Sequence, residues 1–388
     1  MKKILKKLKE TSVLHFVVIA SIFLSSCGNA DVSENDVPSL KDVFEDAFLI
    51  GTALNESQIY GEDKKSVELT KTHFNAITAE NVTKWEVIHP EPGVYNFGPT
   101  DELVAFGEEN DMFIIGHTLV WHSQTPRWVF EDDEGNPVDR DVLIERMRDH
   151  IHTVVGRYKG KIHGWDVVNE ALNEDGTWRE SPWYNIIGED YLVKAFKFAR
   201  EADPEAELYY NDYSLENPEK LAGAVRLVEF LQEHDAPITG IGTQGHWSVR
   251  HPTLEELENT LTDLGNLGID VMITEMDVDV LPAAFHYHGA DISMQAELRE
   301  ELNPYPDGLP EEAQQELAAR YREFFEVILR HRDNVTRVTF WGVTDGDSWL
   351  NNWPVRGRTS YPLLFDREYE PKSAFYSVVD LAKEVLED

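Results

Sequence analysis

Short apolar runs alternate along this chain with longer stretches in which apolar residues recur every three or four positions. The first pattern predicts β-strands and the second predicts amphipathic helices. Eight runs are predicted strands, at residues 48–54, 74–80, 113–120, 162–168, 208–212, 240–245, 271–276 and 337–343. Eight stretches are predicted helices, at residues 67–73, 100–110, 141–158, 190–202, 218–234, 254–267, 310–332 and 373–387. Eight strand–helix units predict an α/β fold, a (β/α)8 TIM barrel in a single domain.

An open, doubly wound sheet is the alternative fold for the same alternation. No Gly-rich phosphate-binding fingerprint follows the first predicted strand, which weakens this alternative.

Residues 280–309 fit neither the strand pattern nor the helix pattern. Their prolines around Tyr305 predict an ordered loop over the barrel mouth, with a helical piece at 292–302.

Polar and aromatic residues gather where the predicted strands end. Because the carboxyl ends of barrel strands form one face, these side chains are expected to meet there. The strand-end residues are Glu80, Asn81, Lys84, His117, Trp121, Asn169, Glu170, Asn211, Asp212, Tyr213, Gln244, His246, Glu275, Asp277, Trp341 and Trp349. Flat aromatic faces with amides, acids and cations suit a sugar, which offers apolar ring faces and many hydroxyl groups.

Two glutamates stand at the ends of apolar strands, Glu170 in WDVVNEAL and Glu275 in ITEMDV. Paired carboxylates over one sugar are what glycoside cleavage needs, one as acid and one facing the anomeric carbon. His246 and Asp277 lie where they could orient Glu275 and favour its charged form, whereas Glu170 has aromatic and amide neighbours that favour a raised pKa. The alternative from these residues alone is that both glutamates form ion pairs with Lys or Arg at the barrel rim.

The net charge of the chain limits the classes of partner that it can bind. The 388 residues carry 72 acidic and 35 basic side chains, a formal charge of −37. So acidic a surface argues against nucleic acid or an anionic membrane face as a partner. It suits an exported protein with a neutral substrate, and we expect a monomer.

The N-terminus resembles a bacterial lipoprotein signal. A cationic segment with five lysines precedes an apolar stretch at 13–24, which is too short to span a bilayer. Leu24-Ser25-Ser26-Cys27 then resembles a lipobox, which implies that Cys27 is lipidated. The predicted organisation is a signal peptide at 1–26, a flexible acidic tether at 27–39 and the catalytic domain at 40–388. An ordinary signal peptide with an incidental cysteine is the alternative; Cys27 is the only cysteine, so no intrachain disulfide can form.

Seven strings in order make the chain similar to the family 10 glycoside hydrolases, the endo-β-1,4-xylanases. They are TAENVTKWE, GHTLVWHSQTP, WDVVNEAL, YYNDYS, GIGTQGHW, ITEMDV and TFWGVTDGDSW, spread over the chain from about residue 78 to residue 349. The resemblance implies a (β/α)8 barrel that hydrolyses xylan with retention. It makes Glu170 the acid/base and Glu275 the nucleophile, with their carboxyl groups about 5–5.5 Å apart.

The resemblance also implies roles for the other strand-end residues. Glu80, Asn81 and Lys84 would hold the sugar on the non-reducing side of the cut. The residues around the reacting sugar would be His117, Trp121, Asn169, Gln244 and His246, with Asn169 reaching its 2-hydroxyl. Trp341 and Trp349 would cover that sugar. Asp277 and Tyr213 are supporting residues, with Tyr213 either flanking the leaving group or packing.

Two other functions remain as alternatives: a related barrel β-1,4-glucanase, and a surface glycan-binding protein without catalysis. No cofactor or metal is expected, because no His-Glu-x-x-His motif occurs and the strand-end residues are accounted for without one. The expected partner is xylan or a xylo-oligosaccharide. The expected location is the cell envelope, at the outer membrane or cell surface, with contact to the membrane only through the lipid anchor.

Overall fold

The structure is a computed structural model that describes residues 37–284 and 290–387. The predicted signal peptide, Cys27 and most of the predicted tether lie outside the described residues. The predicted catalytic domain lies almost entirely within them.

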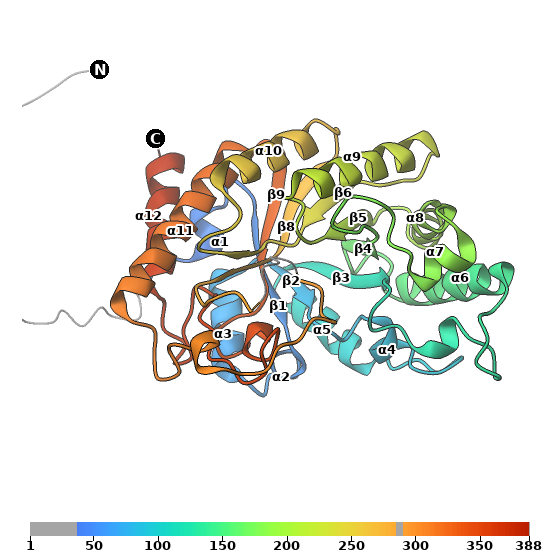
Figure 1. Ribbon diagram of the computed structural model, residues 1–388, viewed down its shortest axis with the longest axis horizontal. Coiled ribbons are helices and arrows are strands. Elements are labelled where there is room, and N and C mark those ends of the chain that lie inside the picture. The colour runs from blue at the N-terminus through green and yellow to red at the C-terminus, as the bar shows by residue number, and fades with distance from the viewer. Residues whose placement is uncertain (1–36, 285–289, 388) are drawn as a thin grey trace, which may run out of the picture. The chain divides into compact units, whose positions relative to one another are not determined.

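Eight parallel strands close into a barrel with helices around them (Figure 1). The hydrogen-bonded order is β6-β5-β4-β3-β2-β1-β9-β8, and a further pairing of β6 with β8 closes the ring. The bounds are β1 Leu49–Leu54, β2 Ala76–Ala79, β3 Phe113–Val120, β4 Gly164–Asn169, β5 Glu207–Asp212, β6 Gly240–Thr243, β8 Asp270–Asp279 and β9 Val335–Phe340. Each corresponds to one predicted strand, so the (β/α)8 prediction is confirmed and the open sheet is wrong.

One long helix follows each barrel strand. These helices are α3 Lys64–His73, α5 Gly98–Glu109, α6 Arg140–Arg157, α8 Asp190–Ala202, α9 Pro218–Glu233, α10 Leu254–Gly265, α11 Glu311–Arg330 and α12 Ser373–Leu386. The shorter elements are α1 Leu40–Val43, α2 Glu56–Ile59, α4 Trp85–Ile88, α7 Pro182–Ile187 and the 3-10 turns η2 Arg127–Val129, η3 Glu300–Leu302 and η4 Trp349–Asn351. Within residues 37–284 and 290–387, none of the helices has the length and apolarity needed to cross a membrane.

Local chemistry accounts for where these helices begin. Thr253 caps α10 by accepting from the Glu256 amide, while the Glu256 side chain accepts from the Thr253 amide, which is a capping box. Asn217 caps α9, and Pro218 occupies the first helical position. An N–H group at this position has no partner within the helix, so the missing N–H of proline costs no hydrogen bond.

Packed side chains fill the interior of the barrel. Ala76, Ile115, Tyr209 and Met272 form a buried cluster there. Gly116 on β3 leaves room for the Trp165 ring of β4, because a Cβ atom at Gly116 would stand 2.1 Å from that ring. A filled interior leaves the carboxyl ends of the strands as the face that can hold a ligand.

A short ninth strand, β7 His246–Ser248, was not predicted as a separate element. Gly245 ends the sixth predicted run, with a φ of +82° that L residues rarely adopt. The chain then pairs with the end of β8, where His246 stands opposite Asp277. This register brings an imidazole beside a carboxylate at the barrel mouth.

The helix predicted at 292–302 is wrong apart from the turn η3 at Glu300–Leu302. Ala296 instead forms a β-bridge with Val355, and its amide donates to the Pro354 carbonyl at 2.8 Å. The Ala296 amide therefore donates to a carbonyl on a neighbouring loop instead of to a carbonyl within a helix.

Candidate active site

One cavity at the carboxyl ends of the strands collects both glutamates and all ten predicted sugar-binding residues. It opens to solvent, and the space within it is about 560 Å³ when that open part is included. The predicted residues that line it are Glu80, Asn81, Lys84, His117, Trp121, Asn169, Glu170, Gln244, His246, Glu275, Trp341 and Trp349. Gln124, Ala290 and Ile292 complete the wall, so described residues of the 280–309 segment do reach the barrel mouth.

Glu170 immediately follows β4 and is buried, with 6% of its surface exposed. Its backbone has a φ of +57°, which is uncommon outside glycine. The Nε1 of Trp121 donates to Glu170 Oε2 at 2.8 Å, and the Nε2 of Gln244 donates to Oε1 at 3.1 Å. Burial raises the pKa of Glu170, and these two donors offset only part of that rise. A carboxyl in this state can hold a proton for a leaving group.

Glu275 on β8 is equally buried but has different partners. Asn211 Nδ2 donates to its Oε1 at 2.8 Å, and His246 Nε2 lies 3.3 Å from its Oε2. Burial by itself raises the pKa of Glu275, but the His246 hydrogen bond and the charges of His117, His246 and Lys84 lower it overall. The pKa values of Glu170 and Glu275 therefore move in opposite directions, the arrangement that separates an acid from an ionised carboxylate.

Among the residues that the structure describes, no Lys or Arg side chain forms an ion pair with either carboxylate. Within the described ranges, the one ion-pair partner of Glu275 is His246, and Glu170 has none. The alternative of two structural ion pairs is therefore wrong. Both carboxylates face the cavity with amide, indole and imidazole donors around them.

Asp277 holds two of the cavity residues in place. Its Oδ2 lies 3.0 Å from His246 Nδ1 and accepts a hydrogen bond from Trp349 Nε1 at 2.8 Å. Burial alone would lower the pKa of His246, but the charge of Asp277 and the bonds to Asp277 and Glu275 raise it to about 10. His246 is therefore a cation at neutral pH and can donate from both ring nitrogens, one to each carboxylate.

Replacing Asp277 with Asn is expected to shift the acidic limb of the kcat/KM profile to higher pH by about one unit. Without the Asp277 charge the pKa of His246 falls, and the cation that stabilises ionised Glu275 is lost at neutral pH. The pKa of Glu275 then rises, so the carboxylate is lost earlier as the pH falls. A pH series on xylan measures this shift. Trp349→Phe, which removes the other bond to Asp277, should leave the acidic limb in place.

Lys84 anchors the part of the cavity that also contains Glu80 and Asn81. Its Nζ donates to Asn81 Oδ1 at 3.0 Å and to Gln124 Oε1 at 2.8 Å, and lies 5.1 Å from the Trp121 ring centroid. Burial raises the pKa of Glu80 and lowers the pKa of Lys84. In each case the opposite charge of the other residue reduces the shift. The result is a preorganised set of donors and acceptors beside an aromatic face, which suits a sugar.

Some polar residues that contact the site were not among the predicted site residues. Gln124 lies in a loop after β3, Asn211 bonds Glu275 from β5, and Asp166 lies 2.9 Å from His117 Nδ1 within the barrel. Asn211 stood among the strand-end residues, and Gln124 belongs to the string GHTLVWHSQTP. No local pattern distinguishes Asp166 from other strand residues, so only its contact with His117 identifies it.

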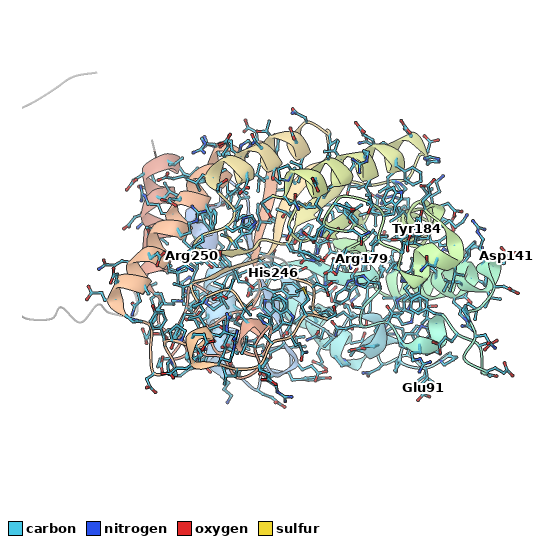
Figure 2. All side chains as sticks on the ribbon, in the orientation of Figure 1. Glu91, Asp141, Arg179, Tyr184, His246 and Arg250 are labelled. Carbon is cyan, nitrogen blue, oxygen red and sulfur yellow. The ribbon has the colours of Figure 1, made fainter. Side chains whose placement is uncertain are left out.

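Tyr213 lies outside the catalytic cavity. It is 2% exposed, its hydroxyl accepts from Arg179 at 2.8 Å, and its ring centroid lies 3.4 Å from Lys220 Nζ. Arg179 also donates from Nε to the carbonyl of Glu170 at 3.0 Å (Arg179 is labelled in Figure 2). Tyr213 thus packs, and through Arg179 it supports the loop that carries Glu170.

The described parts of the chain contain no suitable site for a metal ion. No group of three or more His, Cys, Asp or Glu side chains there could hold an ion. The side chains of the cavity are instead bonded to one another.

Over most of its length this chain is similar to known proteins of one family. The model of the family described as glycosyl hydrolase family 10 matches residues 39–381. Endo-1,4-beta-xylanase A of Xylanibacter ruminicola is 48% identical over 91% of this chain and 95% of its own length. Beta-1,4-xylanase of Dictyoglomus thermophilum is 43% identical over 95% of this chain and 98% of its own length. A solved family 10 endoxylanase from a sugarcane soil metagenome superposes with a TM-score of 0.86 at 45% identity, over 88% of this chain and 100% of that one.

Proposed function

Because this chain belongs to glycosyl hydrolase family 10 and is a retaining endo-1,4-β-xylanase, we propose that Glu275 is its nucleophile and Glu170 its acid/base. The observation that carries the proposal is the opposite direction of the two pKa shifts within one cavity. Retention further requires the two carboxyl groups to stand about 5–5.5 Å apart.

The reaction follows from these two protonation states. Ionised Glu275 attacks the anomeric carbon while protonated Glu170 gives its proton to the departing sugar oxygen. Glu170, now ionised, takes a proton from the water that attacks the glycosyl–enzyme bond. That step frees Glu275 and returns the proton to Glu170, so no cofactor is consumed.

The remaining cavity residues bind the chain of sugars. Glu80, Asn81 and Lys84 would hold the sugar on the non-reducing side, and Asn169 would reach the 2-hydroxyl of the reacting sugar. Asn169 also donates to Glu170 Oε1 at 3.2 Å, so substrate would compete for this amide. The relatives above are xylanases by name, and both glutamates are present, which disfavours a glucanase and a non-catalytic glycan-binding protein.

Substituting each carboxylate separately tests the two roles. The nucleophile is needed for every substrate, whereas the acid is needed only when the leaving group is basic. Activity on xylan and on aryl glycosides, compared for the two variants, therefore distinguishes Glu275 from Glu170.

We further propose that the enzyme is exported and held to the cell envelope, at the outer membrane or cell surface, by a lipid on Cys27. The support is the lysine-rich start, the apolar stretch at 13–24 and the string LSSC. Gly28 follows the cysteine, so no aspartate occupies the next position. The catalytic domain would act on xylan as a monomer outside the cytoplasm.

Replacing Cys27 with Ser is expected to abolish incorporation of labelled fatty acid, because the acylated thiol is gone. The protein should then leave the membrane fraction of the cells that produce it. Fractionation and fatty-acid labelling measure both effects. Ser26→Ala, which keeps the thiol, is the matched control, and a Cys27→Ser protein that stays labelled would refute the anchor.

A further inference from the structure

Glu170 is carried on a short turn that leaves the end of β4, and the shape of this turn decides where its carboxyl group points. β4 ends at Asn169, and Glu170 has a φ of +57°. A residue other than glycine keeps such a backbone conformation only where its surroundings fix it. The contacts that fix residues 170–172 therefore bear directly on the position of the carboxyl group.

Arg179 supplies three of these contacts. Its Nε donates to the Glu170 carbonyl at 3.0 Å, and its Nη2 donates to the Leu172 carbonyl at 3.2 Å. Its backbone amide donates to the Ala171 carbonyl at 2.7 Å. One residue thus binds three successive carbonyls of the turn, and the rigid, planar guanidinium sets the geometry of two of them.

The Arg179 side chain is itself held in place. Its side chain is 17% exposed, its Nη2 also donates to the Tyr213 hydroxyl at 2.8 Å, and its Nη1 lies 3.9 Å from Asp291 Oδ2. The Tyr213 ring faces Lys220, whose buried Nζ forms an ion pair with Asp212 at 3.0 Å. A buried network therefore stands behind the guanidinium and preorganises it.

Arg179 reaches Glu170 through the backbone. The donors to the Glu170 carboxyl group are the side chains of Trp121, Gln244 and Asn169. Within the described ranges, no hydrogen bond or ion pair joins that carboxyl group to Arg179. Glu275 stands on β8 and is held by other residues. A change at Arg179 should therefore move the carboxyl group of Glu170 and leave that of Glu275 in place.

We propose that Arg179 is a positioning residue for acid/base catalysis, which aligns the Glu170 carboxyl group with the leaving oxygen through the carbonyls of residues 170 and 172. The inference rests on the proposed function, in which Glu170 protonates that oxygen and later takes a proton from the attacking water. A misplacement of about 1 Å in a reacting group can cost about 100-fold in rate. The loss should appear only in the steps that need Glu170.

The test measures Arg179→Met on two substrates that differ in their need for an acid. On a linear xylo-oligosaccharide, whose leaving sugar needs a proton, kcat/KM should fall about 10- to 100-fold. On dinitrophenyl xylobioside, whose leaving group departs without a proton, kcat/KM should stay within about twofold of the wild-type value. The kcat on this second substrate should still fall, because Glu170 must activate the water that releases the glycosyl–enzyme. Azide needs no base and should restore that kcat.

Arg200→Met is the matched control. Arg200 on α8 also donates to three backbone carbonyls, those of Asp203, Pro204 and Ala206. These residues precede β5, at the opposite end of the barrel from the catalytic cavity. Arg200→Met should lower the melting temperature and leave the ratio of the two kcat/KM values unchanged.

Arg179→Lys separates geometry from charge and preserves the buried cation if Arg179→Met does not fold. Lysine keeps the charge but cannot reproduce the planar fork, so the ratio of the two kcat/KM values should change as it does in Arg179→Met. A wild-type ratio in Arg179→Lys would overturn the inference, because the charge alone would then suffice.

Other results would also overturn the inference. They are an equal loss on both substrates in Arg179→Met, no loss on either, or a changed ratio in Arg200→Met. Glu170→Ala, measured in parallel, keeps the two claims apart. If Glu170→Ala failed to distinguish the two substrates, the proposed role of Glu170 would fail instead.

Discussion

Replacing Glu275 with Ala is expected to lower turnover of both xylan and aryl xylosides by at least about 10⁴-fold. Without this carboxylate no glycosyl–enzyme bond can form, whatever the leaving group. His246 and Asn211, whose bonds hold Glu275 in place, offer no carboxylate that could replace it. Reducing-sugar release and nitrophenol release measure the two activities.

Azide or formate should restore part of the activity of Glu275→Ala, because a small anion can occupy the space of the lost carboxylate. The product should then have the inverted configuration, since only one displacement takes place. Glu205→Ala, at an exposed glutamate outside the cavity, should match the wild-type enzyme. Substantial unaided activity in Glu275→Ala would reassign the nucleophile.

Replacing Glu170 with Ala is expected to cost about 10²–10⁴-fold on xylan, the usual contribution of a positioned general acid. The loss should be much smaller on aryl glycosides whose leaving groups depart without a proton. The alkaline limb of the pH profile should disappear on those substrates. In the wild-type enzyme that limb reports the loss of the proton from Glu170, whose raised pKa keeps it protonated beyond the usual range of a carboxyl.

Azide distinguishes the two variants by stereochemistry. In Glu170→Ala the nucleophile Glu275 is intact, so azide attacks the glycosyl–enzyme and the product keeps the original configuration. In Glu275→Ala it attacks the substrate itself and inverts the configuration. Equal losses on xylan and activated aryl glycosides in Glu170→Ala would contradict the acid role, as would an inverted azide product from that variant.

The sequence alone determined the barrel and twelve of the fifteen residues that line its cavity. Apolar runs of strand length, each followed by a helical stretch, allow few arrangements that bury both kinds of element. Helix starts such as Pro252-Thr253 ahead of α10 are local, because the capping atoms come from neighbouring residues. Polar residues at the ends of parallel strands must share one face, so Glu170 and Glu275 could be placed in one cavity from their positions alone.

Contacts between distant segments were decided only by the tertiary structure. The conformation at Ala296 is set by the hydrogen bond of its amide to the Pro354 carbonyl and not by a local helical tendency. Tyr213 packs against Arg179 and Lys220 instead of facing substrate. The directions of the pKa shifts likewise depend on which donors and charges surround each buried carboxyl. The two glutamates stand at similar strand ends but acquire opposite protonation tendencies. One reason is that His246, itself held by Asp277, bonds Glu275 and not Glu170. The order of polar residues at the strand ends predicted His246 and Asp277 beside Glu275, but the donors that reach each carboxyl group, and their distances, are set by folding across many residues.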